Sequence, residues 1–567
     1  MSAAAGLVVA VDCSTTAAKA VIHDEAGRAV AQAVRPLRTL QPRPTWHEQD
    51  AEQWWAATQG AVAEAVATLD DPGRVRALCL THQRESFVCV DGAGRPLRPA
   101  ILWLDGRAHQ EIARLGSPRV HELSGKPPDT TPAIYKLAWL ARHEPAVLRD
   151  AVHVGDVQAY LSWRLTGRWA TSHGSADTLG LFDLQALDWS PELLDLAGVR
   201  LDQLPDLVAA GDLLGTVSGD VARSLGLPGP VPLVAGIGDG QAAGLGLGAT
   251  VPGVAYLNLG TSMVLGVQST QYLWDPAFRT LAGIGPGSYT FETVLNAAAY
   301  VATWCRQQFG EAGADGIAGG QMEAAAARLP IGAEGLLMLP YSNAAQTPYW
   351  DALARGATIG WHGRHTRAHL YRSILEGVGF ELRLHLERLE EVTGQRIGSV
   401  RAVGGGARSP LWIRIVTDIT GRPVRVCADP EVSAAGAAAL AWGVPRPPGA
   451  PRRAGRTTGD AAGPRGVARS VDGGRLRRTL WRLPRDVPRA ARAVPRPRRG
   501  RCHLGRVSAR GARHRRGGLP EPATGRVLQM VTACRQRRDG TRRCLRRVRR
   551  ASAAGARTGA PRRLHAR

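Results

Sequence analysis

Two short turns rich in small hydroxyl residues carry the strongest chemical signal in this chain. Ser14-Thr15-Thr16 and Gly260-Thr261-Ser262 each follow an apolar segment, and each is followed by another. Successive backbone N–H groups in such a turn can converge on one point and bind an anion such as phosphate. Either turn alone is more typical of an ordinary hairpin. Its repetition in matched context predicts two turns that hold a nucleotide triphosphate from both sides.

Two charged residues beside the first turn are suited to phosphoryl transfer, a reaction that depends on positioning and charge stabilisation. Asp12 ends the apolar segment 7–11, where a lone carboxylate would be costly unless it faces a cation. We therefore expect Asp12 to bind Mg2+ through water, although a carboxylate at the end of a strand can also simply cap a turn. Lys19 follows the turn closely enough to return its ammonium group to the phosphates.

A third charged residue, Asp239, is the candidate base. It lies in the segment Ala235-Gly236-Ile237-Gly238-Asp239-Gly240, where flanking glycines let backbone and substrate approach closely. A carboxylate in this position could take the proton of an attacking hydroxyl group. Taken alone, Gly-Asp-Gly is more often a turn, so the assignment needs support from the rest of the chain.

Candidate sugar-binding and nucleoside-binding residues lie in other loops. Gln83-Arg84-Glu85 offers donors and acceptors suited to neighbouring hydroxyl groups. Trp103 could form an apolar wall or belong to the core, and Asp105 and Gln241 are candidates for further polar contacts. Gly405-Gly406-Ala407 opens a predicted helix, and its small side chains would let adenosine lie against the backbone.

Two α/β lobes are needed to position these residues. In the first part of the chain we predict a helix over 51–69 and strands at residues 7–11, 18–23, 29–34, 75–80 and 87–90, the last turning back at 91–94. In the second part we predict a helix over 367–393, a strand over 399–403 and a helix over 410–420. The mixture of hairpins and helices indicates a first sheet that begins with antiparallel strands.

The net charge of +24 would suggest a nucleic-acid partner if it were spread over the 567 residues. The positive charge is instead concentrated in one segment. Residues 444–567 hold 36 Arg, no Lys and five acidic residues, so this segment alone carries +31. The other 443 residues therefore carry −7 and compose a mildly acidic protein. We expect nucleic-acid binding, if any, only nonspecifically through the basic segment.

The basic segment 444–567 is dominated by Arg, Pro, Gly and Ala and has no lasting apolar period. Such a composition predicts disorder, because too little apolar surface is available to offset the cost of ordering. Three origins are open: a basic arm, a third folded domain, or an out-of-frame end of the gene. The three Lys and 33 Arg of the first 443 residues indicate GC-rich DNA and favour the third origin.

The cysteines and the apolar segments bear on the location of the protein. Its eight Cys form no C-x-x-C pair and no metal-like spacing with His, as expected for reduced thiols in a cytoplasmic protein. The apolar segment 7–11 is short and lacks a basic leader, which predicts a first strand and not a signal peptide. Residues 242–257 are interrupted by glycines and Pro252, so we expect no membrane span.

Taken in order, these motifs resemble those of the FGGY carbohydrate kinases. The resemblance covers roughly residues 6–443. Its motifs are the segments 12–19, 238–244, 260–262 and 404–412, together with Trp46-x-Glu48-Gln49-Asp50, Trp54-Trp55 and the segment 99–107. The overall pattern is similar in particular to xylulokinases. Glycerol kinases, however, carry a similar Gln-Arg-Glu where many xylulokinases have Gln-Met-His-Gly, and this departure leaves the substrate open.

The resemblance implies an α/β, two-lobed actin-like ATPase (ribonuclease H-like) fold, with ATP and sugar in the cleft between the domains. A sugar-binding domain would span 6–247. An ATP-binding domain would span 252–443 and is expected to be incomplete, because no familiar continuation follows before the tail 444–567. Asp239 matches the catalytic aspartate of the family, and Lys19 matches its phosphate-binding basic residue. Lys136 falls in a helix that resembles the family's Lys-Leu-x-Trp segment, and we expect a surface role for it.

The implied activity is ATP-dependent phosphorylation of a sugar or polyol hydroxyl, with Mg2+ as the metal. D-Xylulose is the first choice of substrate, and glycerol or another polyol is the second. An alternative of another class is an actin-like protein that binds a nucleotide without transferring phosphate. Asp239 and the loop 83–85 argue against that alternative, since a pure switch needs neither. We expect a small-molecule substrate and no membrane partner, and we leave a homodimer open.

Overall fold

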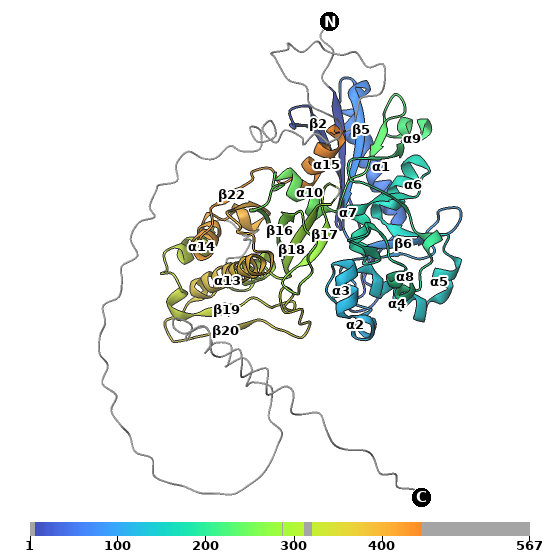
Figure 1. Ribbon diagram of the computed structural model, residues 1–567. Coiled ribbons are helices and arrows are strands. Elements are labelled where there is room, and N and C mark those ends of the chain that lie inside the picture. The colour runs from blue at the N-terminus through green and yellow to red at the C-terminus, as the bar shows by residue number, and fades with distance from the viewer. Residues whose placement is uncertain (1–5, 286, 311–319, 444–567) are drawn as a thin grey trace, which may run out of the picture. The chain divides into compact units, whose positions relative to one another are not determined.

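The computed structural model describes residues 6–285, 287–310 and 320–443 (Figure 1). The predictions for residues 444–567 lie outside this part of the chain. Within it the α/β prediction is confirmed, because the main elements are two six-stranded sheets with helices packed against them.

The first sheet is built around buried apolar strands. Its order is β13 (Leu213–Thr216), β14 (Pro232–Val234), β5 (Val75–His82), β1 (Leu7–Cys13), β2 (Ala17–Asp24) and β3 (Ala29–Pro36). β1 is antiparallel to β2 and parallel to β5, and these pairings set Asp12 opposite Lys19 on one side and Thr81 on the other. Residues 8–11 are fully buried, as expected for a strand covered on both faces.

The second sheet lies in the later part of the chain. Its order is β17 (Arg279–Ala282), β18 (Tyr289–Leu295), β16 (Met263–Ser269), β15 (Val254–Leu259), β21 (Ser399–Val403) and β22 (Val424–Val426). β15 is antiparallel to β16 and parallel to β21. Every residue of β18 is buried, and this strand carries a single acidic side chain, Glu292.

The two sheets repeat one topology. The strands β3-β2-β1-β5-β14 of the first sheet have the same order and relative directions as β18-β16-β15-β21-β22 of the second. The two hydroxyl-rich turns therefore occupy equivalent places, each joining a central strand to its antiparallel neighbour. The likeness of the turns in sequence reflects this repeated sheet.

Longer helices cover the sheets. α1 (Ala51–Ala67) packs against β2 and β3 with Trp54 fully buried, and α13 (Arg367–Thr393) packs against α14 (Pro410–Thr420) in the second lobe. The side chain of Asp50 begins α1 by accepting a hydrogen bond from the N–H of Glu52. Gly394 ends α13 in the left-handed conformation, with φ of 66°, which glycine adopts without strain.

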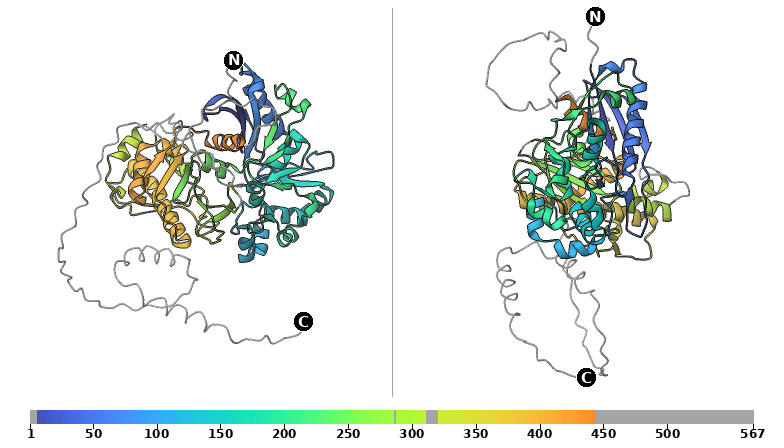
Figure 2. Two further views of the ribbon diagram at one scale, coloured as in Figure 1. Left: turned by 45° about the horizontal axis from the view of Figure 1, so that its top comes forward. Right: turned by 90° about the vertical axis from the view of Figure 1, so that its right-hand side faces the viewer.

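Two shorter helices cross closely near the first sheet. α10 (Asp239–Gly246) packs against α15 (Val432–Trp442), and α15 also lies against β1 and β5 (Figures 1 and 2). A Cβ atom added at Gly246 would lie 2.0 Å from the carbonyl oxygen of Val432, and one at Gly436 would lie 2.0 Å from that of Ala242. Glycine at both positions lets the two backbones approach this closely.

The remaining elements complete the lobes. A four-stranded sheet has the order β4 (Glu48–Gln49), β7 (Ala100–Ile101), β6 (Phe87–Val90) and β8 (His153–Asp156). The other strands are β9 (Ala170–Ser172), β10 (Phe182–Asp183), β11 (Asp188–Trp189), β12 (Asp206–Val208), β19 (Leu337–Leu339) and β20 (Ala357–Ile359). The other α-helices of the described chain are α2 (His109–Leu115), α3 (Pro118–Ser124), α4 (Ala133–His143), α5 (Pro145–Asp150), α6 (Val157–Thr166), α7 (His173–Ala176), α8 (Pro191–Ala197), α9 (Gly219–Ser224), α11 (Ala299–Phe309) and α12 (Gly320–Ala327).

Most predicted elements are present, with some changes of boundary. The helices over 367–393 and 410–420 and the strand over 399–403 have the predicted bounds, whereas β1, β2, β3 and β5 are longer than predicted and α1 ends at Ala67. Residues 87–90 form a strand as predicted, but it pairs mainly with β7 and β8. The predicted turn at 91–94 is present, because the N–H of Gly94 donates to the carbonyl oxygen of Asp91 at 2.9 Å. The returning segment adds a bridge between Val90 and Pro96 and a hydrogen bond from the N–H of Leu97 to the carbonyl oxygen of Cys89 at 2.9 Å.

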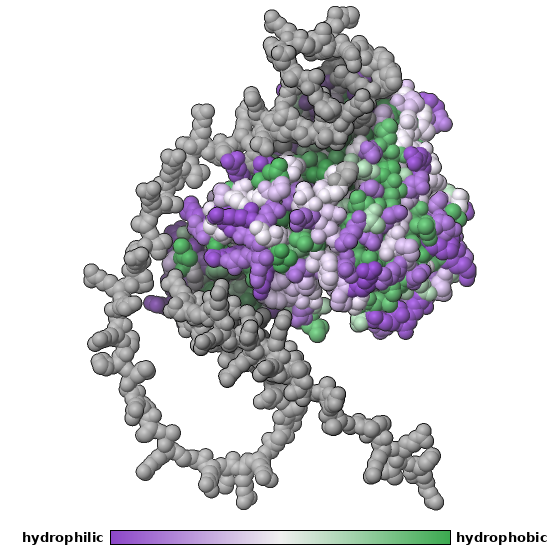
Figure 3. Space-filling view, in the orientation of Figure 1, coloured by the Kyte–Doolittle hydropathy of each residue, from purple (hydrophilic) through white to green (hydrophobic). Residues whose placement is uncertain are grey.

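The hydrophilic residues at the surface and the free thiols of the cysteines are as expected from the composition of the chain. Hydrophilic residues are spread over both lobes on the face shown in Figure 3. Among the described residues, no helix combines the length and the apolar character needed to cross a membrane. The cysteines in the described ranges, which are Cys13, Cys79, Cys89, Cys305 and Cys427, are all buried free thiols.

Candidate active site

A cavity of about 470 Å³ is lined by residues of both lobes, including Thr15 of the first turn, Ser262 of the second and Asp239. Two groups of lining residues differ in character. We call the first group the polar wall, and it consists of Arg84, Glu85, Trp103, Thr131, Arg279 and Gln346. We call the second group the glycine wall, and it consists of Gly404, Gly405, Arg408, residues 426–428, Pro430, Val432 and Ser433.

The first turn is joined to the polar wall through the hydroxyl group of Thr15. Trp103 Nε1 donates a hydrogen bond to Thr15 Oγ1 at 2.9 Å, and this hydroxyl group donates in turn to Gln83 Oε1 at 3.2 Å. Gln83 is buried and is not among the residues that line the cavity. Its side chain therefore holds the first turn, while Trp103 is both a cavity wall and a hydrogen-bond donor.

The other residues of the two turns mainly fix the turns themselves. Ser14 Oγ donates to the carbonyl oxygen of Ala17 at 2.9 Å, and Thr16 is exposed. In the second turn, Ser262 Oγ donates to the carbonyl oxygen of Asn296 at 3.2 Å. The carbonyl groups of Gly260 and Thr261 accept hydrogen bonds from N–H groups at the start of α11. Each turn thus presents one hydroxyl residue to the cavity, Thr15 or Ser262.

Asp239 is the first residue of α10 and faces the cavity. Its Oδ1 atom lies 3.1 Å from Arg84 Nε and accepts a hydrogen bond from the N–H of Gly240 at 2.7 Å. The side chain is 40% exposed, so a substrate hydroxyl group can reach it. The N-terminal end of a helix favours a negative charge, which suits a carboxylate held ready to accept a proton.

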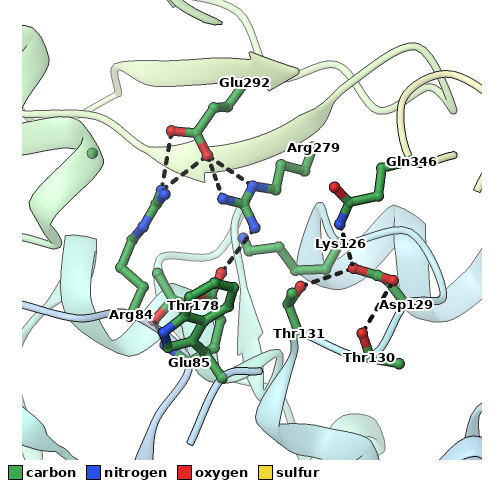
Figure 4. Close-up of polar contacts among 12 residues, drawn as sticks. Arg84, Glu85, Lys126, Asp129, Thr130, Thr131, Thr178, Arg279, Glu292 and Gln346 are labelled. Atoms are coloured by element: carbon green, nitrogen blue, oxygen red, sulfur yellow. Dashed lines mark hydrogen bonds and ion pairs between the residues drawn. The ribbon is translucent and has the colours of Figure 1, made fainter. Parts of the chain in front are cut away.

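Asp239 is one end of a row of five charged residues, which we call the arginine–carboxylate chain. The row runs from the first lobe into the second and returns to the first. Its members in order are Asp239, Arg84, Glu292, Arg279 and Glu85. Arg84 Nη1 lies 3.0 Å from Glu292 Oε2, and Arg279 Nη1 lies 3.0 Å from Glu85 Oε1. Figure 4 shows both arginine side chains directed at the carboxylate of Glu292.

Glu292 is the centre of this chain. Burial on its own would raise the pKa of its carboxyl group, but the guanidinium groups of Arg84 and Arg279 outweigh burial and lower the pKa to about 2. Tyr256 Oη donates a further hydrogen bond to Glu292 Oε1 at 2.5 Å. Glu292 is therefore a carboxylate at any pH that the protein would meet in a cell.

Glu85 has an unusual backbone. Its φ is 60°, in the left-handed region that a residue with a side chain seldom adopts, and its N–H donates to Thr178 Oγ1 at 3.3 Å. Holding a non-glycine residue there costs about 1–3 kcal/mol, and such strain is concentrated at functional sites. The strained backbone places Glu85 on the polar wall, where Arg279 holds its carboxylate.

Besides Gln83, two more residues with predicted sugar contacts do not line the cavity. Asp105 is buried, and its carboxylate is held by Arg107 Nε at 2.8 Å and by the N–H of His47 at 2.6 Å. Gln241 is also buried, and its Nε2 donates to the carbonyl oxygen of Gly174 at 3.0 Å. Both side chains are engaged in holding the surrounding loops.

The surface role expected for Lys136 is wrong, because this residue is fully buried in α4. Its Nζ donates to three carbonyl oxygens, those of Thr131 at 2.7 Å, Thr130 at 2.8 Å and Trp103 at 3.3 Å. Burial lowers the pKa of the ammonium group to about 8. The long side chain of Lys136 reaches from α4 to two loops, where these three carbonyl oxygens satisfy the buried ammonium group.

Asp12 has the environment of a metal-binding carboxylate. Its Oδ1 atom is buried without a hydrogen-bond partner. Burial first, and then the carboxylate of Asp239, raises the pKa of Asp12 to about 7, although Lys19 opposes the shift. An orphaned carboxylate oxygen coupled to a second carboxylate fits a hard cation. No group of three His, Cys, Asp or Glu side chains suited to a metal ion occurs in the described ranges, so a cation here would need water and phosphate oxygens as its other ligands.

Lys19 lies beside this carboxylate but is paired with another residue. Its Nζ is 2.6 Å from Glu431 Oε2, and Glu431 directly precedes α15. The pair joins β2 to the start of that helix. The phosphate contact expected for Lys19 stays a prediction.

The glycines of the glycine wall lie at the turn between β21 and α14, and its residues from 426 onward lie between the end of β22 and the start of α15. Gly404 has a φ of 100°, and a Cβ atom there would be 2.8 Å from the carbonyl oxygen of Leu259. Gly405 lines the cavity, whereas Gly406 and Ala407 are buried. A Cβ atom at Gly406 would lie 2.7 Å from side-chain atoms of Leu259 and Trp412. Of the predicted adenosine triplet, the first residue faces the cavity and the other two pack against β15 and α14.

Several residues of the cavity were not found from the sequence. They include Arg279, Asn258, Asn296 and Gln346. Glu292, which does not line the cavity but pairs with Arg84, was not found either. A signal for Glu292 was present, because a single carboxylate inside the apolar run Phe291-Glu292-Thr293-Val294 must have a buried partner. Nothing in the spacing indicates that the partner is Arg84, 208 residues earlier.

The geometry defines the class of protein. Two lobes with the same sheet topology contribute to one cavity, and each offers a hydroxyl-rich turn at an equivalent strand end. A carboxylate at a helix start lies on the same cavity as these turns and the polar wall. This is the architecture of a phosphotransferase with the actin-like ATPase fold.

Comparison with known proteins identifies the family. The model of the N-terminal domain of the FGGY family of carbohydrate kinases matches residues 7–246, and that of the C-terminal domain matches residues 255–442. A xylulose kinase of Escherichia coli strain K12 is 32% identical over 443 residues, which are 77% of this chain and 89% of the relative. A glycerol kinase of Citrifermentans bemidjiense is 30% identical over 452 residues, covering 76% of this chain and 89% of the relative.

A solved structure agrees with these sequences. The crystal structure of xylulose kinase from Rhodospirillum rubrum superposes with a TM-score of 0.72 at 30% identity, covering 77% of this chain and 89% of the other. The chain belongs to the FGGY family of carbohydrate kinases. The expected fold class and the expected family are thereby confirmed.

Proposed function

We propose that the chain transfers the γ-phosphoryl group of ATP to a hydroxyl group of a ketopentose such as D-xylulose. The observation that carries the proposal is the position of Asp239, which shares one cavity with a residue from each turn and with the polar wall. Both the E. coli and the R. rubrum relatives are xylulose kinases, and their likeness supports this choice of sugar.

The proposed reaction is a single phosphoryl transfer. Asp239 accepts the proton of the substrate hydroxyl group while the oxygen of that hydroxyl group attacks the γ-phosphorus. A new oxygen–phosphorus bond forms, and the bond from the γ-phosphorus to the bridging oxygen breaks, leaving its electron pair on ADP. Arg84 Nε and the N–H of Gly240 hold the Asp239 carboxylate in place, so the carboxylate needs little rotation to meet the hydroxyl group.

The remaining residues have positioning roles in this proposal. Thr15 and Ser262 contact the phosphates from opposite turns, and Gly405 lets the adenosine lie against the backbone. Asp12 would hold Mg2+ through water. When bound, Mg2+ supplies charge neutralisation for the phosphate oxygens. Arg84, Glu85 and Trp103 contact the sugar, while Gln83, Asp105 and Gln241 support the loops that carry these residues.

Glycerol or another polyol is the second candidate substrate. The loop Gln83-Arg84-Glu85 favours it, and one relative of similar identity is a glycerol kinase. A survey of ADP release with D-xylulose, other ketoses, aldoses, xylitol and glycerol separates the candidates. We expect the highest kcat/KM with D-xylulose. Activity confined to glycerol would reverse the order of the two substrates.

A chain that binds nucleotide without transferring phosphate is the alternative of another class. Binding of ADP together with the absence of any phosphorylated product across the same survey would establish that alternative. The cytoplasmic location and the homodimer remain predictions from the sequence.

A further inference from the structure

The arginine–carboxylate chain leaves little capacity for a second anion. Glu292 accepts from Arg84 Nη1 through both of its oxygens, at 3.0 and 3.1 Å, and Asp239 takes Arg84 Nε. Arg279 donates through Nε at 2.8 Å and is paired through Nη2 at 2.5 Å with Glu292, and its Nη1 is paired with Glu85. Both guanidinium groups of the polar wall are therefore already paired with carboxylates of the protein, Arg279 through all three of its nitrogen atoms and Arg84 through Nε and Nη1.

The charges of this chain do not cancel. It contains three carboxylates and two guanidinium groups, so it carries one net negative charge. Of the lysines near the polar wall, Lys126 is paired with Asp177 at 3.2 Å, and the charge of Lys136 is opposed by those of Asp105, Glu85 and Asp129. Arg408 also lines the cavity, but on the glycine wall. In a buried site the net negative charge of the arginine–carboxylate chain is poorly screened, and it repels an anion that approaches the polar wall.

A neutral sugar meets no such obstacle. Its hydroxyl groups can both donate to carboxylate oxygens and accept from N–H groups. A sugar acid, in contrast, must find a cation that is not already held, or displace one of the three carboxylates. Repulsion of the wrong ligand is a common source of specificity.

We propose that Glu292 determines the charge class of the substrate by holding both guanidinium groups, so that the site accepts neutral sugars and polyols and rejects sugar acids. Glu292 is fully buried and is not among the cavity-lining residues, so it acts through Arg84 and Arg279 as a positioning residue. This inference rests on the proposed function and deepens it, since it concerns the sugar that the same site takes.

The first measurement uses the unmodified protein. Xylitol and D-xylonate have the same number of carbons and differ at C1, which is a CH2OH group in one and a carboxylate in the other. We expect D-xylonate to inhibit phosphorylation of D-xylulose with an inhibition constant at least about tenfold higher than that of xylitol. Equal inhibition by the two compounds would overturn the inference, and no variant has to fold for this result.

The second measurement uses Glu292→Gln, which keeps the size of the side chain and an oxygen for Tyr256 Oη while removing one negative charge. We expect the ratio of inhibition constants, D-xylonate over xylitol, to fall by about tenfold, because Arg84 and Arg279 are then short of a partner charge. A merely structural change would weaken both inhibitors together and leave the ratio unchanged. An unchanged ratio in a variant that unfolds at a temperature close to that of the unmodified protein contradicts the proposal.

Glu381→Gln is the matched control. Glu381 is also a buried glutamate of the second lobe with a tyrosine partner, Tyr341 Oη at 2.5 Å, but it does not line the cavity. We expect the ratio of inhibition constants, D-xylonate over xylitol, to be the same in this variant as in the unmodified protein. The two proposals fail in different ways: a protein that phosphorylates no neutral sugar refutes the proposed function. A protein that phosphorylates D-xylulose and is equally inhibited by both compounds refutes only the role of Glu292.

Discussion

At the scale of single residues, Asp239 owes its orientation to two contacts on the same oxygen atom, an ion pair with Arg84 and a hydrogen bond from the N–H of Gly240. Arg84 Nε and the N–H of Gly240 both contact Oδ1, so the carboxylate has a fixed plane while its side chain remains partly exposed. Arg84 is itself fixed by Glu292. The candidate base is thus positioned by a residue of the other lobe through one intervening guanidinium group.

We expect Asp239→Asn to lower kcat by at least about a hundredfold, because an amide cannot accept the proton of the attacking hydroxyl group. The dissociation constant of ADP should change little, since Asp239 is not needed to hold the nucleotide. Steady-state kinetics and calorimetric titration with ADP measure the two quantities. Asp220→Asn, at an exposed position of α9, is the control and should leave both unchanged. A fully active Asp239→Asn protein would remove Asp239 from the mechanism.

Asp12 provides a second expectation at this scale, in the form of a pH dependence. The pKa of its carboxyl group is raised to about 7 by burial and by Asp239, so below pH 7 a proton competes with a cation for the carboxylate. Mg2+ affinity should therefore be about tenfold weaker at pH 6 than at pH 8. Titration of the ADP-bound protein with Mg2+ at both pH values tests this. In Asp12→Asn the affinity should be weak at both, and an equally strong pH dependence in that variant would place the metal elsewhere.

At the scale of elements, the crossing of α10 and α15 connects the helix that carries the candidate base to the first sheet. Asp239 begins α10, and α15 packs on β1 and β5. The crossing depends on Gly246 and Gly436, each of which faces a carbonyl oxygen of the other helix. The position of the candidate base therefore depends on two glycines that make no contact with a substrate.

We expect Gly436→Ala to lower the free energy of unfolding by about 1–3 kcal/mol or more, because the new methyl group would overlap the carbonyl oxygen of Ala242 and force the helices apart. Thermal unfolding followed by circular dichroism measures the loss. Gly229→Ala is the control, since nothing lies within 4 Å of the added atom. If the two variants unfold at the same temperature, the close crossing of α10 and α15 is not present in solution.

Lys136 links α4 to two loops of the polar wall. Its ammonium group joins the main chain of Trp103 to that of Thr130 and Thr131, and Trp103 and Thr131 line the cavity. We expect Lys136→Met to raise the KM for the sugar by about tenfold or more while leaving the KM for ATP unchanged, because only the loops that we propose to bind the sugar lose their connection. Arg142→Met, at an exposed position of the same helix, is the control.

The pH dependence of the sugar KM tests the same linkage without a variant. The groups that face Lys136 are Asp105, Glu85, Asp129 and Arg107, and the pKa of its ammonium group lies at about 8. Above that pH the neutral amine has one hydrogen fewer to donate to the three carbonyl oxygens. The sugar KM should therefore rise above pH 8, and this rise should be absent in Lys136→Met. An equal rise in both proteins would assign it to another group.

At the scale of the whole molecule, the sequence predicted the structural features that depend on neighbouring residues or on a repeated motif. The two turns, the boundaries of α13 and α14 and the first strands follow from apolar periodicity and small-residue runs, and the repeated sheet explains why the turns look alike. The arginine–carboxylate chain did not follow, because Arg84 and Glu292 meet only through the joining of the lobes. The burial of Lys136 was also missed, since a lysine is ordinarily exposed unless the fold supplies acceptors.

The contact between the two lobes leads to a last prediction, which concerns an ion pair that connects them. Glu85 of the first lobe and Arg279 of the second form a pair whose side chains are only 5% and 10% exposed, so the pair exists only while the lobes are together. A double-mutant cycle with Glu85→Gln and Arg279→Met isolates its contribution, because the effects of both single changes on other partners cancel. We expect a coupling free energy of about 1 kcal/mol or more in thermal or denaturant unfolding of the ligand-free protein. The exposed pair Arg383 and Glu387 on α13 serves as the control, with a coupling of about 0.5 kcal/mol or less. A coupling near zero for Glu85 and Arg279 would mean that the lobes are separated without substrate, and the arginine–carboxylate chain would then assemble only as the sugar binds.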